Sequence, residues 1–328
     1  MGPRRATHWV NACAALLAVG LSTYAALWST PRALTAGATA PGWGELSSAI
    51  PIDLPDGGRA LTDATGASIR LAPYHRIASG SLLADPLLLS LCSPGDIAAF
   101  SGRAPLSRDA YRYAGKPSVN PTRRVEHLIE LQPDLVLVNS LGEHAWVERL
   151  RDAGLVVFDL GPMWGVETFL HSVSVIGWLV GRPEAARELA FHFKARLAAI
   201  ARDVPPAARR GGLYVGIHGS QMYGGTRGSS FNDVLSYAGL LDVAAKDYRG
   251  WPTYTPEALL TLDPEVIVTQ TGMASQLCSR SELGRLRACG ARGDVIELDP
   301  QLLSDAGLGM LDAAELIHLG AYPPEPAP

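Results

Sequence analysis

The chain has 328 residues, of which 47% are hydrophobic and 18% charged, and its formal net charge at pH 7 is −4. This length is enough for two domains that each bury a sizeable core. No long run of basic residues follows the first 45 positions, which argues against a nucleic-acid partner.

Residues 1–40 have the anatomy of an export signal. Arg4 and Arg5 form a positive start, an apolar stretch runs over about residues 10–28, and small residues at 36–40 form a cleavage zone. The apolar stretch is also near the length that spans a bilayer, so an uncleaved anchor is the alternative. Either way, we expect the working part in the periplasm or on the outer face of the cytoplasmic membrane.

Three cysteines lie beyond this segment. Cys278 and Cys289 could close a small loop by a disulfide in an oxidising compartment, which would leave Cys92 as a free thiol. Three reduced and buried thiols are the alternative interpretation.

The first half of the chain alternates short apolar runs with helical patterns. In chain order, we predict a hairpin at residues 62–71, a strand at 76–79, a helix at 85–91, a loop rich in Arg and Tyr at 101–121, a helix at 146–153 and a strand at 155–160. Asp85 is expected to cap its helix, with Pro86 at the first helical position.

One unit of the sequence occurs twice. Glu126 begins a short apolar-periodic run that Pro133 ends, and an acidic residue then precedes the aliphatic run Leu135–Val138. The same pattern begins again at Glu257, 131 residues later. Each copy predicts a helix, a proline stop and a buried strand of a parallel sheet. Two copies at this spacing indicate two similar α/β lobes rather than a solenoid.

A long helical pattern separates the two copies. Residues 166–180 keep one apolar face, and residues 184–202 form a second stripe that a Pro pair ends. About twenty residues at ~1.5 Å each make a rod of ~30 Å, the diameter of a small domain. The predicted boundaries are 1–40 for the signal or anchor, 41–182 for the N-terminal lobe, 183–203 for the interlobe helix, 204–322 for the C-terminal lobe and 323–328 for a Pro-rich tail.

The second half of the chain also alternates short apolar runs with helical patterns. We predict a strand at 212–217, a glycine-rich loop at 218–230, a helix at 231–238, an aromatic loop at 248–254, the second unit from 256, a short helix at 283–288, a strand at 295–298 and a final helix at 309–319.

Together these motifs resemble the periplasmic substrate-binding proteins that serve importers of vitamin B12, ferric siderophores and haem. The resemblance covers roughly residues 50–322. It depends on the strand at 76–79, Asn120 with the first unit, the long helix, the second unit, and residues 249–252, which resemble the vitamin B12-binding members. Residues 82–91 depart from the family because they lack its Thr-Glu helix start.

The resemblance implies two Rossmann-like α/β lobes joined by one long rigid helix, with a ligand cleft between them. It implies a monomer that delivers a metal chelate to an ABC permease dimer with its ATPase. The protein itself would need no cofactor, although its ligand can carry iron or cobalt. In this family the carboxylates that match Glu126 and Glu257 dock on the two permease subunits. The alternative is that each only stabilises its own helix dipole.

Ligands of open α/β sheets bind outside the carboxyl ends of the strands, so both sets of ends should face the cleft. The loops there are aromatic and contain arginine, which suits a flat macrocycle, a catecholate or an anionic chelate. The candidate ligand-binding residues are Arg108, Tyr111, Tyr113, Trp164, His218, Tyr223, Tyr248, Arg249 and Trp251. For any single aromatic residue, plain packing is the alternative.

The expected ligand is a ferric siderophore first, cobalamin second and haem third. Arg and Tyr at 103–113 favour an anionic iron chelate, whereas Trp251 favours cobalamin. A haem iron would need a Tyr or His ligand, and Tyr111, Tyr113, Tyr223 and His218 are equal candidates.

Enzymes are a poor match to this sequence. It lacks a Gly-x-Ser-x-Gly elbow after a strand, and the glycine-rich residues 224–230 lack the Lys of a phosphate-binding loop. The rival class is therefore a bilobal ligand sensor or chaperone domain with no role in transport.

Overall fold

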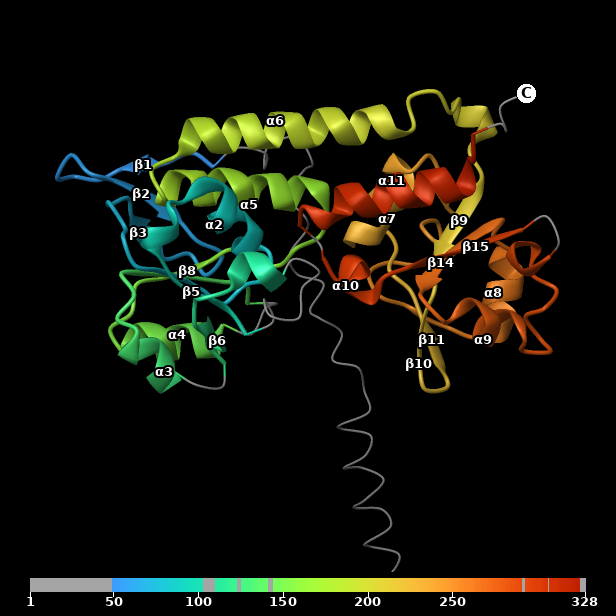
Figure 1. Ribbon diagram of the computed structural model, residues 1–328, viewed down its shortest axis with the longest axis horizontal. Coiled ribbons are helices and arrows are strands. Elements are labelled where there is room, and N and C mark those ends of the chain that lie inside the picture. Colours follow the sequence, from blue (N-terminus) through green and yellow to red (C-terminus); the bar gives the residue numbers. More distant parts are fainter. Residues whose placement is uncertain are drawn as a thin grey trace, which may run out of the picture. The chain divides into compact units, whose positions relative to one another are not determined.

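The computed structural model describes residues 49–102, 110–122, 125–140, 144–290, 293–305 and 307–324. Within these residues, two parallel sheets organise the chain (Figure 1). The first has the order β6-β5-β4-β7-β8 and the second the order β12-β9-β14-β15. The strands of the first sheet are β4 (Ile77–Ser79), β5 (Ile97–Ser101), β6 (Ser118–Val119), β7 (Leu135–Val138) and β8 (Val157–Asp159). Those of the second are β9 (Gly211–Tyr214), β12 (Leu241–Asp242), β14 (Val266–Gln270) and β15 (Asp294–Leu298).

The two predicted aliphatic runs are the inner strands β7 and β14. Every residue of β7 is buried, as are the first four residues of β14. A strand inside a parallel sheet is covered on both faces, which explains why these runs do not alternate with polar residues. The predicted pair of α/β lobes is confirmed.

Ten helices occur in the described part of the chain. They are α2 (Ala84–Leu91), α3 (Val125–Glu130), α4 (Ala145–Asp152), α5 (Val166–Leu179), α6 (Pro183–Ile200), α7 (Ser230–Tyr237), α8 (Pro256–Leu262), α9 (Ala274–Cys278), α10 (Pro300–Leu303) and α11 (Gly309–Ala321). Short 3-10 helices are η1 (Pro94–Asp96), η3 (Ala110–Tyr113), η4 (Pro206–Ala208) and η5 (Arg287–Cys289). None of the described helices is both long enough and apolar enough to cross a bilayer.

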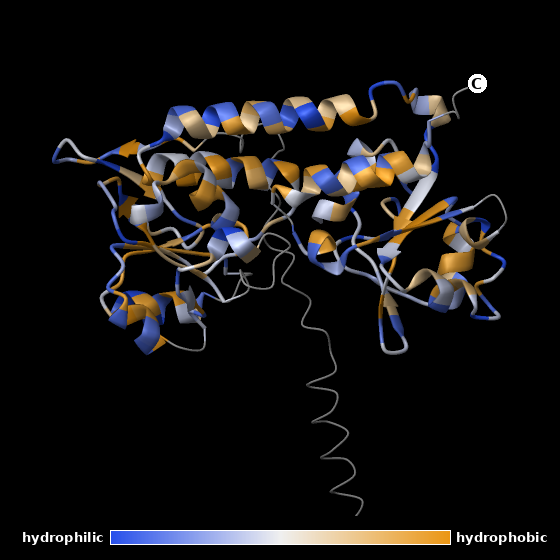
Figure 2. Ribbon diagram, in the orientation of Figure 1, coloured by the Kyte–Doolittle hydropathy of each residue, from blue (hydrophilic) through white to orange (hydrophobic). Residues whose placement is uncertain are grey.

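The long helix α6 follows the elements of the first sheet and precedes β9, the first strand of the second. It packs along α5 and α11 (Figure 1). Phe193 of α6 lies 4.9 Å from the ring of Phe169 in α5, and Arg196 forms a 2.7 Å ion pair with Glu315 of α11. Figure 2 shows apolar residues concentrated on the strands and on α5 and α11, with a mixed pattern along α6. The predicted interlobe helix is therefore a helix that contacts elements of both lobes.

Two small antiparallel sheets complete the strands. The first joins β1 (Ile52–Asp53), β2 (Arg59–Thr62) and β3 (Ser68–Arg70), which confirms the predicted hairpin at residues 62–71. The second joins β10 (Gly216–His218), β11 (Gln221–Tyr223) and β13 (Thr253–Tyr254).

The strand predicted at 212–217 and the loop predicted at 218–230 were wrong in detail. The chain leaves the parallel sheet after Tyr214 and forms the β10–β11 hairpin, in which His218 lies opposite Gln221. This register leaves a two-residue turn that begins with Gly219 at φ +60°. A tight hairpin turn needs positive φ at its first position, which a glycine adopts without strain.

The predicted cap at Asp85 was also wrong. The helix begins one residue earlier, and the Oγ of Ser81 accepts hydrogen bonds from the backbone N–H groups of Leu83 and Ala84 at 3.2 and 3.3 Å. Asp85 is buried inside the first turn, where its carboxylate accepts hydrogen bonds from the N–H and hydroxyl of Ser101 at 3.1 and 2.6 Å. Asp85 thus ties α2 to β5, and Ser81 acts as the cap.

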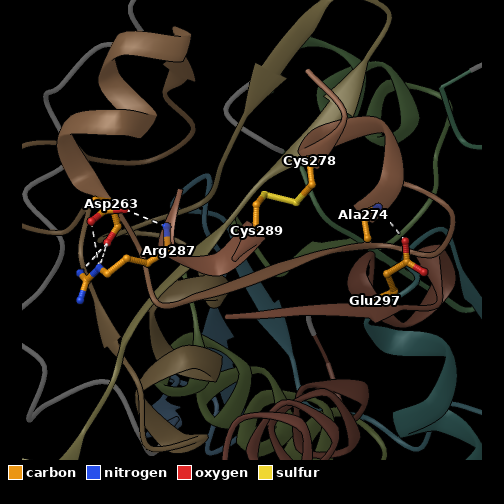
Figure 3. The surroundings of a disulfide bond; sticks show 6 residues. All are labelled: Asp263, Ala274, Cys278, Arg287, Cys289 and Glu297. Atoms are coloured by element: carbon orange, nitrogen blue, oxygen red, sulfur yellow. Dashed lines mark hydrogen bonds and ion pairs between the residues drawn. A yellow bond between two sulfur atoms is a disulfide. The ribbon is translucent and has the colours of Figure 1, made fainter. Parts of the chain in front are cut away.

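The helix predicted at 283–288 is instead a series of turns closed by a disulfide between Cys278 and Cys289 (Figure 3). The Cα atoms of this pair lie 5.4 Å apart. Leu283 and Leu286 inside the loop are buried, so the apolar spacing reflects packing rather than a helix. Cys92 is a half-buried free thiol, and burial raises its pKa.

Candidate functional site

Polar side chains line the carboxyl ends of the first sheet. The carboxylate of Asp159, at the end of β8, accepts hydrogen bonds from the backbone N–H groups of Ser140 and Gly161, each at 2.9 Å, and from the Ser140 hydroxyl. The Nδ1 of His144 lies 2.9 Å from the Ser140 hydroxyl and 3.4 Å from Asp159 Oδ2. These contacts orient the half-exposed imidazole of His144 at the start of α4.

The same edge is tied to strand β4. The Asn139 side chain donates a 2.8 Å hydrogen bond to the Gly161 carbonyl and accepts one from the Ser81 hydroxyl. Residues after β4, β7 and β8 are therefore joined directly, and the rim of the first sheet is held in place before any ligand arrives.

A buried ion pair fastens the β2–β3 hairpin to this rim. Asp63 pairs with Arg151 of α4, and its Oδ2 also accepts a 3.0 Å hydrogen bond from the backbone N–H of Asp159. Because Asp63 is buried, its pairing with a cation and a backbone N–H is what makes its burial tolerable.

The predicted first-lobe ligand residues separate into different environments. Arg103 and Arg108 lie outside the described residues. Tyr111 is largely exposed on η3, and Trp164 is exposed after β8. Tyr113 packs edge-on against Phe100 with the ring centroids 4.8 Å apart and is buried. Tyr113 is therefore a packing residue in this structure, whereas Tyr111 and Trp164 remain available to a ligand.

In the second lobe, one face of the β10–β11–β13 sheet is buried. Ile217 lies opposite Met222, and Met222 lies opposite Tyr254 on the next strand. All three side chains are buried. Tyr248 packs its ring edge-on against Tyr254, 5.4 Å away, so it belongs to this inner face. The structure therefore separates Tyr248 from the other predicted aromatic residues.

The opposite face of the same hairpin carries the predicted residues His218 and Tyr223. Side chains alternate along a strand, so Gly216 and His218 of β10 share a face with Gln221 and Tyr223 of β11. His218 and Gln221 are exposed near the turn, and Tyr223 is half-buried.

Tyr223 begins a row of aromatic side chains that ends in solvent. Its ring lies 6.4 Å from that of Tyr214, which stacks on Phe231 at 3.8 Å, and Phe231 meets Trp251 edge-on at 5.3 Å. Trp251 is 55% exposed. We call Tyr223, Tyr214, Phe231 and Trp251 the aromatic row. It brings together two of the predicted site residues and two that the sequence did not single out.

Two polar groups fix the inner end of the aromatic row. The Tyr214 hydroxyl is hydrogen-bonded with Tyr223 and Gln270, and burial raises the pKa of Tyr214 above its ordinary value. A Cβ on Gly216 would lie 2.5 Å from the Tyr223 ring, so only glycine lets that ring lie across β10. The orientation of Tyr223 is thus set by its neighbours.

The two lobes meet beside the aromatic row. The backbone N–H of Val166 donates a 2.7 Å hydrogen bond to Asp233 of α7, and a Cβ on Gly165 would lie 2.2 Å from the same carboxylate. Trp164 directly precedes this contact, and Phe231 of the aromatic row lies in the same first turn of α7. The exposed Trp164 of the first lobe and the buried Phe231 of the second are therefore both close in sequence to this contact between the lobes.

Residues 85–302 match the model of a protein family described as periplasmic binding protein, which is well over half of the chain. The chain belongs to this family. It is 26% identical over 209 residues to an uncharacterized ABC transporter substrate-binding lipoprotein, YvrC, of Bacillus subtilis, covering 61% of this chain and 65% of that protein. It is 28% identical over 194 residues to a cobalamin-binding protein of Halobacterium salinarum, covering 56% of this chain and 51% of that one. The matched part thus spans between half and two-thirds of these relatives.

Solved structures show the same fold. A possible iron-binding periplasmic protein from Staphylococcus epidermidis superposes with a TM-score of 0.67 at 20% identity, covering 76% of this chain and all of that one. The periplasmic heme-binding protein RhuT from Roseiflexus superposes with a TM-score of 0.65 at 19% identity, covering 76% and 98%.

In this periplasmic binding protein, the carboxylates Glu126 and Glu257 occupy the first turns of α3 and α8 and are exposed. Thr255 caps α8 by accepting a 3.2 Å hydrogen bond from the N–H of Ala258. Hydrogen bonds from its own backbone and from Thr255 lower the pKa of Glu257. Both carboxylates are therefore accessible to a partner.

The second acidic residue of each repeat has a structural role. Asp134 accepts a hydrogen bond from the backbone N–H of Arg76 at 2.9 Å, just before β4. Glu265 accepts one from the N–H of Gly211 at 2.8 Å, where β9 begins. These carboxylates hold the start of the neighbouring strand, a function that Glu126 and Glu257 do not share.

Three residues of the candidate site were missed from the sequence: His144, Tyr214 and Phe231. The fixing of His144 by Asp159 joins residues that are distant in sequence. Tyr214 and Phe231 were predicted only as parts of a strand and a helix.

The predicted residue Arg249 is exposed beside Trp251, as a ligand contact requires. Among the described residues, no group of three or more His, Cys, Asp or Glu side chains could hold a metal ion.

Proposed function

We propose that this chain is the extracytoplasmic substrate-binding protein of an ABC importer and that it captures a macrocyclic tetrapyrrole chelate, either cobalamin or haem. The aromatic row carries this proposal, because it runs from Tyr223, which shares a face of the hairpin with His218, to the exposed Trp251. Large rigid aromatic faces give extensive apolar contact with a macrocycle at little cost in side-chain entropy.

The metal of such a chelate can take one further ligand from the protein. Tyr and His are the residues that do this for haem iron; His218 and Tyr223 end strands β10 and β11, and His144 lies at the start of α4. The Nδ1 of His144 lies beside the carboxylate of Asp159, and a carboxylate in this position commonly orients a metal-binding imidazole. The tetrapyrrole itself would supply the iron or cobalt.

A ferric siderophore is the second candidate. The exposed Tyr111 and Arg249 could meet an anionic chelate. The order nevertheless differs from the one expected from sequence, because the aromatic row is the feature of the described residues that carries the proposal. The relationship to a protein described as cobalamin-binding and the fold shared with a heme-binding protein add weight to a tetrapyrrole.

Delivery requires a partner. Glu126 and Glu257 would dock on the two halves of a permease dimer that is coupled to an ATPase, since they occupy matching positions in the two lobes. Uptake should therefore fall in the double variant Glu126→Ala/Glu257→Ala while ligand affinity stays unchanged. Unchanged transport would instead leave these carboxylates with only the role of stabilising their helix dipoles.

The ligand is tested by titrating the purified protein with cyanocobalamin, haemin and a panel of ferric siderophores, followed by Trp fluorescence and visible spectra. We expect micromolar or tighter binding of one tetrapyrrole, about −8 kcal/mol or more favourable. Trp251→Ala should weaken it about tenfold or more. Phe191→Ala, an exposed aromatic residue on α6, is the matched control and should change nothing. If no chelate binds, the sensor or chaperone alternative takes precedence.

A further inference from the structure

The two helices that carry the docking carboxylates share a second surface feature. Ile129 lies three residues after Glu126 and is 42% exposed, and Leu260 lies three residues after Glu257 and is 38% exposed. Residues three apart lie on the same side of a helix. Each lobe therefore displays a carboxylate and an aliphatic side chain together.

The buried anchors of the two helices are the preceding residues. Leu128 and Leu259 are fully buried and attach each helix to its lobe, whereas Ile129 and Leu260 stay accessible to a partner. A single exposed aliphatic residue needs no explanation. Here the same register recurs 131 residues apart, each time beside an exposed Glu.

We propose that Glu126 with Ile129, and Glu257 with Leu260, form a two-part docking surface for the permease dimer, each half of which offers a cation beside an apolar pocket. This inference rests on the proposed function. The carboxylates argue against an anionic lipid surface as the occupant, because like charges repel, and favour a basic protein surface.

The carboxylates and the aliphatic side chains would contribute to docking in different ways. Exposed ion pairs contribute little affinity in water but accelerate association, and salt screens them. Burial of an aliphatic side chain is insensitive to salt screening and slows dissociation. The proposal therefore predicts that the two kinds of substitution have different kinetic signatures.

The test is to measure association and dissociation rates between the full chain and its permease–ATPase complex in phosphatidylcholine nanodiscs, at low and high salt. Glu126→Gln/Glu257→Gln should slow association at low salt, with the effect shrinking at high salt. Ile129→Ser/Leu260→Ser should speed dissociation about tenfold or more at both salt concentrations. Unfolding midpoints and ligand affinity should stay at wild-type values in both variants.

The matched control is Leu316→Ser/Leu319→Ser on α11, where the two leucines are 45% and 56% exposed but lie outside the repeated unit. This control should dock like the wild type. The aliphatic contact would be refuted if the Ile129→Ser/Leu260→Ser variant dissociated at the wild-type rate while the Glu126→Gln/Glu257→Gln variant associated slowly. The proposed function would still stand in that case. Equal losses in the control would also overturn the aliphatic contact. A wild-type chain that does not bind the permease at all would instead refute the proposed function.

Discussion

In both lobes a short helix ends in a residue with left-handed backbone that precedes a proline. Gln132 follows α3 with φ +46°, and Asp263 follows α8 with φ +38°. A helix end of this kind leaves carbonyl oxygens that need donors. The two copies can therefore be compared by asking which groups donate hydrogen bonds to those carbonyl oxygens.

An arginine does so in each lobe. Arg76 donates from Nε to the Gln132 carbonyl at 3.1 Å and from Nη2 to the Leu131 carbonyl at 2.6 Å. Arg287 donates from Nε and Nη2 to the Asp263 carbonyl at 3.1 and 2.6 Å. The backbone requirement is the same, and the planar guanidinium meets it in both places.

The two arginines come from unrelated parts of the chain. Arg76 immediately precedes β4, whereas Arg287 begins η5 inside the loop that the Cys278–Cys289 disulfide closes (Figure 3). Asp263 also accepts hydrogen bonds from the N–H and Nε of Arg287 through its own carboxylate, at 3.0 and 2.9 Å. The two helix ends are therefore satisfied by arginines from different parts of the chain, and the arginine of the second lobe lies in a loop closed by a disulfide.

The largest expected effect comes from breaking that link. Cys278→Ser/Cys289→Ser should lower the free energy of unfolding by roughly 3 kcal/mol, because it frees a short loop in the unfolded chain and releases Arg287 in the folded one. Urea unfolding with and without reductant measures this. The first lobe should be unaffected in hydrogen exchange, and loss of protection there as well would contradict the separation between the lobes.

The next effect tests a buried carboxyl of the first lobe. Burial raises the pKa of Asp85 from 3.8 to about 6, and hydrogen bonds from Ser101 only partly oppose this. Between these two values the folded state binds more protons than the unfolded state, so stability falls as pH rises through this window. The change should be at most about 3 kcal/mol, since one pKa unit corresponds to about 1.4 kcal/mol, and complete above about pH 6.

Asp85→Asn removes this titration while keeping the shape of the side chain. Urea midpoints of the variant and the wild type should therefore converge at pH 4 and separate at pH 7, with the variant losing less stability. Parallel pH profiles for the two proteins would show that Asp85 is not the titrating group.

A smaller effect compares the two arginines directly. Arg76→Ala and Arg287→Ala should each cost ~1 kcal/mol, the value of exposed hydrogen bonds to helix-end carbonyls. Lysine should not restore stability at either position, because it cannot donate in the same fork. Equal losses for Arg287→Ala in wild-type and disulfide-free backgrounds would show that the disulfide does not position Arg287 through this contact.

Much of the fold could be predicted because its determinants are local. The runs at Leu135–Val138 and Val266–Val268 indicate buried strands by themselves, and the repeat indicates two lobes. The site could not be resolved in the same way. Tyr113, Tyr223 and Tyr248 look alike in the sequence, and only the pairing of Met222 with Tyr254 and the position of Phe100 decide which of them faces inward.

The smallest expected change concerns the motion of the lobes. The helix α6 packs on α5 and on α11, and the Val166–Asp233 hydrogen bond adds a contact near the aromatic row. A connector held along its length allows less rotation than a flexible hinge, so ligand binding should close the lobes only slightly. Small-angle scattering with and without the bound chelate should give nearly superimposable curves. Asp233→Ala, which removes the carboxylate that meets Val166, should increase the difference, and a large compaction of the wild-type protein would refute the idea of a braced connector.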